Sequence, residues 1–267
     1  MELRLVQVDA FADRPFTGNP AAVMPLDGWL PDAMLQAIAE ENNLSETAFT
    51  VPLPGPEADY ELRWFTPTTE VALCGHATLA SGHVLIERDE VRFLTRKAGV
   101  LAVRRDGDGY ALDLPVTLVR EQPHPELLEV LGTPGASVFI SCAGAEATAV
   151  VLVDDEAAVR ACAPDMKRLA GIELMVIVTA RGPGSGAGAG TDVVSRVFVP
   201  AWGVDEDPVT GSAHAALAPF WAERLGRDSF TAFQASRRGG HVACRLAGDR
   251  AVLGGRCVTV IEGTMRL

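Results

Sequence analysis

The sequence is poor in positive charge for its length. Among 267 residues, 23 are Lys or Arg and 35 are Asp or Glu, which gives a formal net charge of −12 at pH 7. Such a chain repels phosphate backbones and anionic lipids at long range, so we expect neither nucleic acid nor a membrane as a partner. Hydrophobic residues make up 48% and charged residues 22%, a globular composition that suits one large domain or two modest ones.

Long hydrophobic runs and a targeting segment are also missing. The first residues lack the basic region and apolar core of a secretory signal. Apolar stretches such as residues 149–153 are far shorter than the ~20 residues that a membrane helix needs. We therefore expect a cytoplasmic protein.

Metal and disulfide patterns are absent. The cysteines are odd in number and scattered without CxxC spacing, so we expect mainly small buried side chains, not a disulfide framework or a zinc site. His76 and His83 lie on one helix face but about 10 Å apart, too far to share an ion, and HExxH does not occur. The cysteines are Cys74, Cys142, Cys162, Cys244 and Cys257.

Nucleotide-binding and Ser–His motifs are missing as well. The glycine-rich segment 181–190 contains neither GxGxxG nor GK[ST], and the only lysines, Lys97 and Lys167, are far from it in the sequence. We interpret this segment as a surface loop. Ser212 and His214 are two residues apart on an expected helix, so they point in different directions and do not form a Ser–His couple.

Short alternating segments bounded by turn residues predict mostly antiparallel sheet. A helix is expected from Pro31 onward, with an apolar face formed by Met34, Leu35, Ile38 and Ala39. The expected strands cover residues 3–8, 61–65, 91–95, 99–104, 110–114, 137–141, 147–153, 174–179, 193–199, 241–246 and 258–261.

The second half of the sequence repeats a pattern of the first half. FTP at 65–67 precedes CGHATLA at 74–80, and FVP at 198–200 precedes TGSAHAA at 210–216. In both places a strand leads through a Pro turn and an acidic loop to a glycine and an Ala-rich helix. This similarity predicts two related halves, each built around one helix, although chance resemblance between two common units is the alternative.

Both glycines begin a helix whose first N–H groups are unpaired and lie at the positive end of its dipole. These starts, Gly75 and Gly211, are able to grip a carboxylate or stabilise an enolate-like charge. Ser212 is able to donate to the same ligand, or it is a plain helix cap.

Three carboxylates are candidates for acid–base chemistry. Glu46 stands where a helix ends and an apolar strand begins, and Glu206 and Asp207 lie in the loop before the second helix. A carboxylate in apolar surroundings gains the raised pKa that a general acid or base needs. The alternatives are a solvated strand-edge glutamate for Glu46 and a turn or capping residue for Asp207.

Together these motifs resemble the PhzF-like, phenazine-biosynthesis family within the diaminopimelate-epimerase-like fold. The resemblance covers nearly the whole chain, and its most specific segments are LCGHATLA and EDPVTGSAH. The matching segments are residues 16–23 (FTGNPAAV), 43–49 (NLSETAF), 73–80 (LCGHATLA), 206–214 (EDPVTGSAH), 234–236 (QAS) and 238–240 (RGG).

The resemblance implies an α+β fold of two pseudo-symmetric domains, each a barrel-like, mostly antiparallel sheet around a central helix. The expected domains are residues 1–115 with 250–267, and residues 116–249. The active site would lie in a cleft between them, and homodimers are common in the family. By the same resemblance Glu46, His76 and Asp207 are catalytic, and Asn19, Gly75, Gly211 and Ser212 bind substrate.

The implied reaction is a cofactor-free isomerisation of a small carboxylate such as trans-2,3-dihydro-3-hydroxyanthranilate, with Glu46 moving the proton. No metal is expected, and Glu46 and Asp207 should meet in one cleft. One alternative is an amino-acid racemase that uses Cys74, which is disfavoured because the second motif has no cysteine. The other is a non-catalytic small-molecule-binding protein of the same fold.

Overall fold

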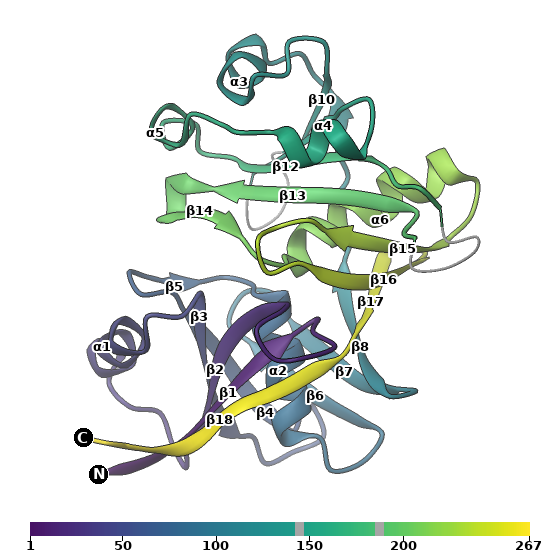
Figure 1. Cartoon of the computed structure of the whole chain (residues 1–267). Coiled ribbons are helices and arrows are strands. Elements are labelled where there is room, and N and C mark those ends of the chain that lie inside the picture. Colours follow the sequence, from purple (N-terminus) through teal and green to yellow (C-terminus); the bar gives the residue numbers. More distant parts are fainter. Residues whose placement is uncertain (142–146, 185–189) are drawn as a thin grey trace. The chain divides into compact units, whose positions relative to one another are not determined.

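The computed structural model describes residues 1–141, 147–184 and 190–267, which form two compact units. Unit 1 comprises Met1–Leu114 and Gly254–Leu267, and unit 2 comprises Pro115–Leu253 (Figure 1). Cys142 and the middle of the glycine-rich segment lie outside the described residues. Among the residues described, no helix is both long enough and apolar enough to cross a membrane.

Unit 1 is a strongly curved sheet with two helices. Its strands pair in the order β18–β1–β2–β3–β4–β6–β7–β8, and β5 pairs with the second half of β4. The chain ends lie side by side because β1 and β18 are antiparallel (Figure 1). The elements are β1 (Glu2–Ala10), β2 (Asn19–Pro25), α1 (Asp32–Asn42), β3 (Glu46–Pro52), β4 (Tyr60–Phe65), β5 (Glu70–Val71), α2 (Gly75–Leu85), β6 (Glu90–Thr95), β7 (Val100–Asp106), β8 (Gly109–Pro115) and β18 (Cys257–Arg266).

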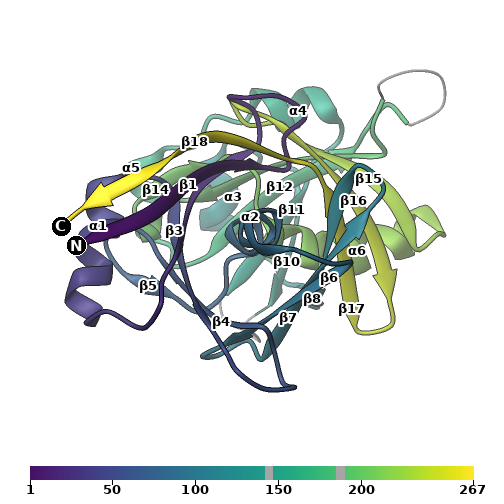
Figure 2. The same ribbon diagram turned by 90° about the horizontal axis from the view of Figure 1, so that it is seen from below.

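Helix α2 lies at the centre of this sheet. Every residue from 75 to 82 is buried, and the helix contacts β1, β2, β3, β7 and β18 (Figure 2). The packing is close because small residues line the helix: a Cβ atom on Gly82 would lie 2.4 Å from the Cγ1 atom of Val103. Helix α2 is therefore a core element, and its small residues reflect the space available rather than helix propensity alone.

Unit 2 is built from a second set of strands around α6. Its pairing order is β9–β10–β11–β12–β13–β15–β16, and β14 pairs with the end of β13. The elements are β9 (Arg120–Glu121), α3 (Pro125–Leu131), β10 (Ser137–Ser141), β11 (Thr148–Leu152), α4 (Glu156–Ala161), α5 (Met166–Leu169), β12 (Met175–Arg181), β13 (Val193–Val199), the 3-10 turn Pro200–Trp202, β14 (Val204–Asp207), α6 (Gly211–Leu225), β15 (Ser229–Gln234), β16 (Gly240–Ala247) and β17 (Arg250–Gly255).

The two units share one pattern of strand pairing. The sequence of steps from β1 to β7 is antiparallel, parallel, antiparallel, antiparallel, parallel, antiparallel, and the steps from β10 to β16 repeat it. In each unit the second parallel step crosses over through the buried helix, α2 or α6. This repetition confirms the expected α+β fold class of two pseudo-symmetric halves.

An arginine clamp recurs at the same place in both units. Arg63 of β4 binds Glu70 of β5 through two hydrogen bonds of 2.8 Å, and Arg196 of β13 binds Glu206 of β14 through bonds of 2.7 and 2.9 Å. Each guanidinium also lies over the phenylalanine two residues further on, at 5.0 Å in unit 1 and 4.9 Å in unit 2. Glu206, a candidate acid–base residue by sequence, is therefore an anchor of the β13–β14 hairpin.

Two details differ from the expectations. Met34, expected on the apolar face of α1, is 40% exposed, whereas Leu35 and Ile38 are buried. The second domain boundary lies after Leu253 and not at residue 250, because the chain turns at Gly248 (φ +67°) into β17, whose first half stays with unit 2. The periodicity also missed the strands β2, β5, β9, β14, β15 and β17. It missed the helices α3, α4 and α5 as well, because they are too short for a clear helical pattern.

Candidate active site

The predicted site residues of unit 1 gather where β3 begins beside the start of α2. Helix α1 ends at Asn43 in the left-handed conformation (φ +48°), and the chain turns directly into β3, whose first residue is Glu46. His76 is the second residue of α2, and Cys74 precedes the helix in an extended conformation. The parallel β2–β3 pairing and the central position of α2 bring these segments together.

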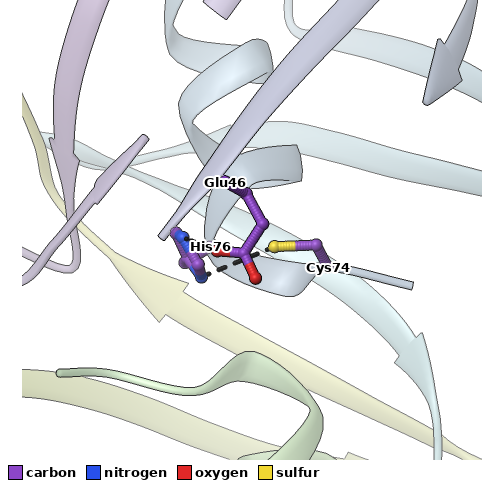
Figure 3. Close-up of side chains that lie close together, drawn as sticks. All are labelled: Glu46, Cys74 and His76. Carbon is purple, nitrogen blue, oxygen red and sulfur yellow. Dashed lines mark hydrogen bonds and ion pairs between the residues drawn. The ribbon is translucent and has the colours of Figure 1, made fainter. Parts of the chain in front are cut away.

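Glu46 and Cys74 both approach the ring of His76 (Figure 3). Glu46 Oε2 lies 3.0 Å from His76 Nε2, and Cys74 Sγ lies 3.5 Å from His76 Nδ1. The His76 side chain is 4% exposed and that of Glu46 is 17% exposed. A carboxylate that is open on one side is thus held against a buried imidazole.

Asn19 connects this pair to a serine. The Asn19 side chain is fully buried at the start of β2, and its Nδ2 atom lies 3.1 Å from His76 Nδ1. The hydroxyl of Ser45 donates to Asn19 Oδ1 at 3.1 Å. Ser45 was missed at the sequence level, and its only signal was its position beside Glu46 in the NLSETAF segment.

Burial and charge determine the protonation of the group. Burial, followed by the charge of Glu46, raises the pKa of the Cys74 thiol to about 11, so this sulfur carries a proton at neutral pH. Burial lowers the pKa of His76, but the nearby Cys74 sulfur and Glu46 carboxylate raise it, and the net direction is upward. The site thus combines a protonated Cys74 thiol with a His76 imidazole whose raised pKa favours uptake of a proton beside Glu46.

Glu46, Cys74 and His76 are also the one group, within residues 1–141, 147–184 and 190–267, whose ligand atoms could hold a metal ion. These atoms lie within 4.8 Å of one another, a proximity that sequence spacing missed because Glu46 comes from a different strand. The carboxylate and the thiol, however, contact different ring nitrogens, whose lone pairs point to different sides of the imidazole. An ion held by all three residues would therefore replace at least one of these two contacts.

The predicted site residues of unit 2 lie at and after the end of β14. Asp207 is buried there and accepts a hydrogen bond from the hydroxyl of Thr210. The side chain of Gln234 braces the same loop: Oε1 accepts from the Thr210 N–H at 2.9 Å, and Nε2 donates to the Asp207 carbonyl at 2.7 Å. Ser236 adds a bond to the Pro208 carbonyl at 2.8 Å. The QAS segment thus fixes the loop that carries Asp207.

Helix α6 begins at Gly211, directly after this loop. Its N-cap residue is Thr210, so Ser212 lies inside the first turn, and the simple capping role considered for Ser212 is wrong. Ser212 Oγ contacts the sulfur of Met175 at 3.7 Å, whereas His214 Nδ1 donates to the Thr210 carbonyl at 2.7 Å. Different partners confirm that Ser212 and His214 do not form a catalytic couple.

The structure therefore groups the site residues into two sets. Glu46, His76, Asn19 and Gly75 belong to unit 1, and Asp207, Gly211 and Ser212 belong to unit 2. The meeting of Glu46 and Asp207 in one cleft stays a prediction.

The family model of phenazine biosynthesis-like proteins matches residues 8–263. The chain belongs to this family. It is 50% identical to an uncharacterized isomerase of Pseudomonas aeruginosa over the whole of both chains. It is 37% identical to the phenazine biosynthesis-like domain-containing protein of Homo sapiens, over 99% of each chain.

A solved structure agrees with these sequence relatives. The crystal structure of a PhzF-family phenazine biosynthesis protein from Enterococcus faecalis superposes with a TM-score of 0.90, at 40% identity and over 100% of both chains. The expected family and the class of enzyme, an isomerase, are thereby confirmed.

Proposed function

We propose that this chain is a cofactor-independent isomerase that moves a proton between carbon atoms of a small carboxylate metabolite. Glu46 is its general base and general acid. The observation that carries the proposal is the contact of Glu46 Oε2 with His76 Nε2 at 3.0 Å, on a carboxylate that keeps 17% of its side-chain surface open. A single carboxylate is able to take a proton from one carbon and return it to another without any change in oxidation state.

The other residues of unit 1 support this chemistry. His76 orients the Glu46 carboxylate and donates or receives a proton through Nε2. The surroundings are buried, which strengthens the hydrogen bonds and slows loss of the proton to solvent. The N–H groups at the start of α2, at Gly75 and His76, are suited to bind the negative charge that develops when the proton leaves carbon.

The residues of unit 2 have complementary roles in the proposal. Asp207, held by Thr210 and braced by Gln234, is a second proton-transfer group. Gly211 and Ser212 bind the substrate carboxylate with the first N–H groups of α6 and the serine hydroxyl. These roles require that both halves of the site contact one substrate molecule.

The racemase alternative is weaker in this geometry. A two-base racemase needs a thiolate, and the pKa of Cys74 is raised to about 11, so its sulfur is a poor base at neutral pH. We therefore place Cys74 beside the reacting groups and not among them. The other alternative is a non-catalytic binding role, and a turnover assay distinguishes it from an isomerase.

The decisive experiment follows trans-2,3-dihydro-3-hydroxyanthranilate in deuterated water by NMR and mass spectrometry. We expect the native chain to isomerise it, with activity that persists after exhaustive chelation. Glu46→Gln should reduce turnover by roughly 10²–10⁴-fold, because the general base is lost while the side-chain size is kept. Glu41→Gln, an exposed glutamate on α1, is the matched control and should leave turnover unchanged.

Each result has a distinct meaning. Equal turnover by the native chain and Glu46→Gln would remove Glu46 from the mechanism. Loss of activity on chelation that added metal restores would refute the cofactor-independent proposal. Turnover by neither protein would reject this substrate, and a panel of other small carboxylates would then separate an isomerase from a binding protein. The homodimer implied by the family stays a prediction, for which light scattering is the test.

A further inference from the structure

Two donors face the Nδ1 atom of His76. The Ser45 hydroxyl donates to Asn19 Oδ1, so the other end of that amide, the Nδ2 group, points at the ring. An amide nitrogen only donates, and the protonated thiol of Cys74 on the same side of the ring is also a donor. Nδ1 therefore accepts in this arrangement, and the proton of the neutral ring lies on Nε2, where it faces Glu46.

The same groups also suit the charged ring. An imidazolium carries a proton on Nδ1 and needs an acceptor there. Rotation of the Asn19 amide by half a turn would present Oδ1 to Nδ1–H and Nδ2 to Ser45. The serine hydroxyl both donates and accepts, so it serves either orientation of the amide.

We propose that Asn19 and Ser45 are positioning residues that form a reversible relay, in which the Asn19 amide turns over when His76 gains or loses its Nδ1 proton. The relay keeps a proton on His76 Nε2, 3.0 Å from Glu46 Oε2, in both states. A fully buried Asn19 and a 3%-exposed His76 leave little room for water to replace either partner. The titratable groups that face the ring in unit 1 are Glu46 from β3 and Cys74 from the residue before α2.

The relay deepens the proposed function, because a histidine that exchanges protons with substrate must be stable in both states. Its existence is nevertheless measurable without turnover. Ring-nitrogen NMR of the full-length chain, labelled with ¹⁵N-histidine, distinguishes a protonated from a bare nitrogen at each ring position. The resonances of His76 are identified by their loss in His76→Gln.

For the native chain we expect a neutral form with Nε2 protonated and Nδ1 bare. The side-chain amide signals of Asn19 should shift with the same midpoint as the His76 ring during a pH titration. In Ser45→Ala the amide loses the hydroxyl that serves both orientations, and its signals should no longer follow the ring.

Asn19→Asp places a carboxylate against Nδ1 and should hold the proton there. We expect the titration midpoint of His76 to rise by roughly one pH unit or more, as for an opposite charge within a few ångströms. Asn43→Asp is the matched control, because it adds the same charge at an exposed asparagine that ends α1. It should leave the midpoint nearly unchanged, since solvent screens it.

Several results would overturn the relay. One is a neutral His76 with its proton on Nδ1. Another is a set of Asn19 side-chain signals that do not shift during the His76 titration. The third is a His76 titration midpoint in Asn19→Asp equal to that in Asn43→Asp. If Asn19→Asp does not fold, the native and Ser45→Ala spectra still decide. The expected spectra, with no turnover of any small carboxylate in the panel, would refute the proposed function and leave the relay standing. Turnover together with a neutral His76 protonated on Nδ1 would refute the relay alone.

Discussion

Two buried histidines of this chain have opposite proton affinities because their neighbours differ. Burial lowers the pKa of both. His76 has the carboxylate of Glu46 at 3.0 Å, and its net pKa is raised. Among the described residues, the hydrogen-bond partner of His214 is the Thr210 carbonyl, and burial lowers the pKa of His214 to about 4. The first is suited to proton exchange, whereas the second is a neutral structural donor.

The buried His214 should make stability depend on pH. Its folded pKa of about 4 lies below the ordinary value of 6.5, so the unfolded chain takes up a proton first as the pH falls. The stability present above pH 6.5 is therefore lost between about 6.5 and 4, by up to about 3 kcal/mol. His214→Asn keeps a donor for the Thr210 carbonyl but does not titrate. Urea unfolding over this range should show a shallower loss in His214→Asn, and equal slopes would contradict the assignment.

Cys74 should be dispensable for catalysis. Its thiol is buried and its pKa is raised to about 11, so at neutral pH it is neither a base nor a reactive nucleophile. We expect Cys74→Ser to retain turnover within about tenfold, and iodoacetamide to react slowly at pH 7. A loss as large as that of Glu46→Gln, measured in the same deuterium assay, would return the thiol to the mechanism.

The helices α2 and α6 are shaped by the sheets that enclose them. Both begin with a glycine and continue with small residues, and both are buried over most of their length. The bulky aromatic residues Phe220 and Trp221 lie beyond the first two turns of α6. Close packing and not the intrinsic preference of the residues accounts for the composition of α2.

Gly82→Ala tests this reading of α2. A Cβ atom there would lie 2.4 Å from Val103 Cγ1 and 2.7 Å from Val103 Cβ, and valine is stiff about χ1. We expect a loss of about 1–3 kcal/mol, more than the roughly 1 kcal/mol that alanine adds to a helix. Gly28→Ala is the control, because a Cβ atom there would have no neighbouring atom within 4 Å. Combining Val103→Ala with Gly82→Ala should partly restore the stability that Gly82→Ala loses. Unchanged thermal melting of Gly82→Ala would refute the close packing.

At the scale of the whole molecule, the internal repeat extends from sequence to side-chain contacts. Both units have the same order of strand pairings. Each also has its own crossover helix and its own arginine clamp on a two-strand hairpin. The residues at the helix starts differ in chemistry. Unit 1 brings Glu46 and a Cys–His pair to α2, and unit 2 brings Asp207 and a serine to α6. The repeated scaffold thus carries different residues at its two helix starts.

The two arginine clamps should contribute differently to the free energy of unfolding. Arg63 is 3% exposed and binds both Asp32 and Glu70, whereas Arg196 is 15% exposed and binds Glu206. We expect Arg63→Met to lower the free energy of unfolding by about 2–3 kcal/mol and Arg196→Met by less, because fewer carboxylates lose their partner.

Denaturant unfolding of both variants measures this difference. Arg168→Met is the control, since its pair with Glu129 is exposed and should contribute under about 1 kcal/mol. Equal losses for the buried and the exposed arginine would show that the clamps do not hold the hairpins.

Much of this protein follows from local sequence. Alternation located most strands, and the strand–Pro turn–glycine–helix echo revealed the two halves, because side-chain periodicity and turn chemistry act over a few residues. The same echo drew attention to Gly75, His76, Asp207 and Gly211. The role of the first glutamate did not follow from its local surroundings, and the resemblance to a family supplied it.

The contacts that make the site were decided only by the tertiary structure. Asn19 meets His76 across 57 residues, and Gln234 braces Asp207 across 27. The capture of Glu206 by Arg196, and the hydroxyl of Ser45 on Asn19, were equally invisible in the sequence. Such pairs depend on strand register and on the position of a buried helix, which are set by long-range packing. Residue types are therefore readable from the chain, but which of them share a proton is decided by the fold.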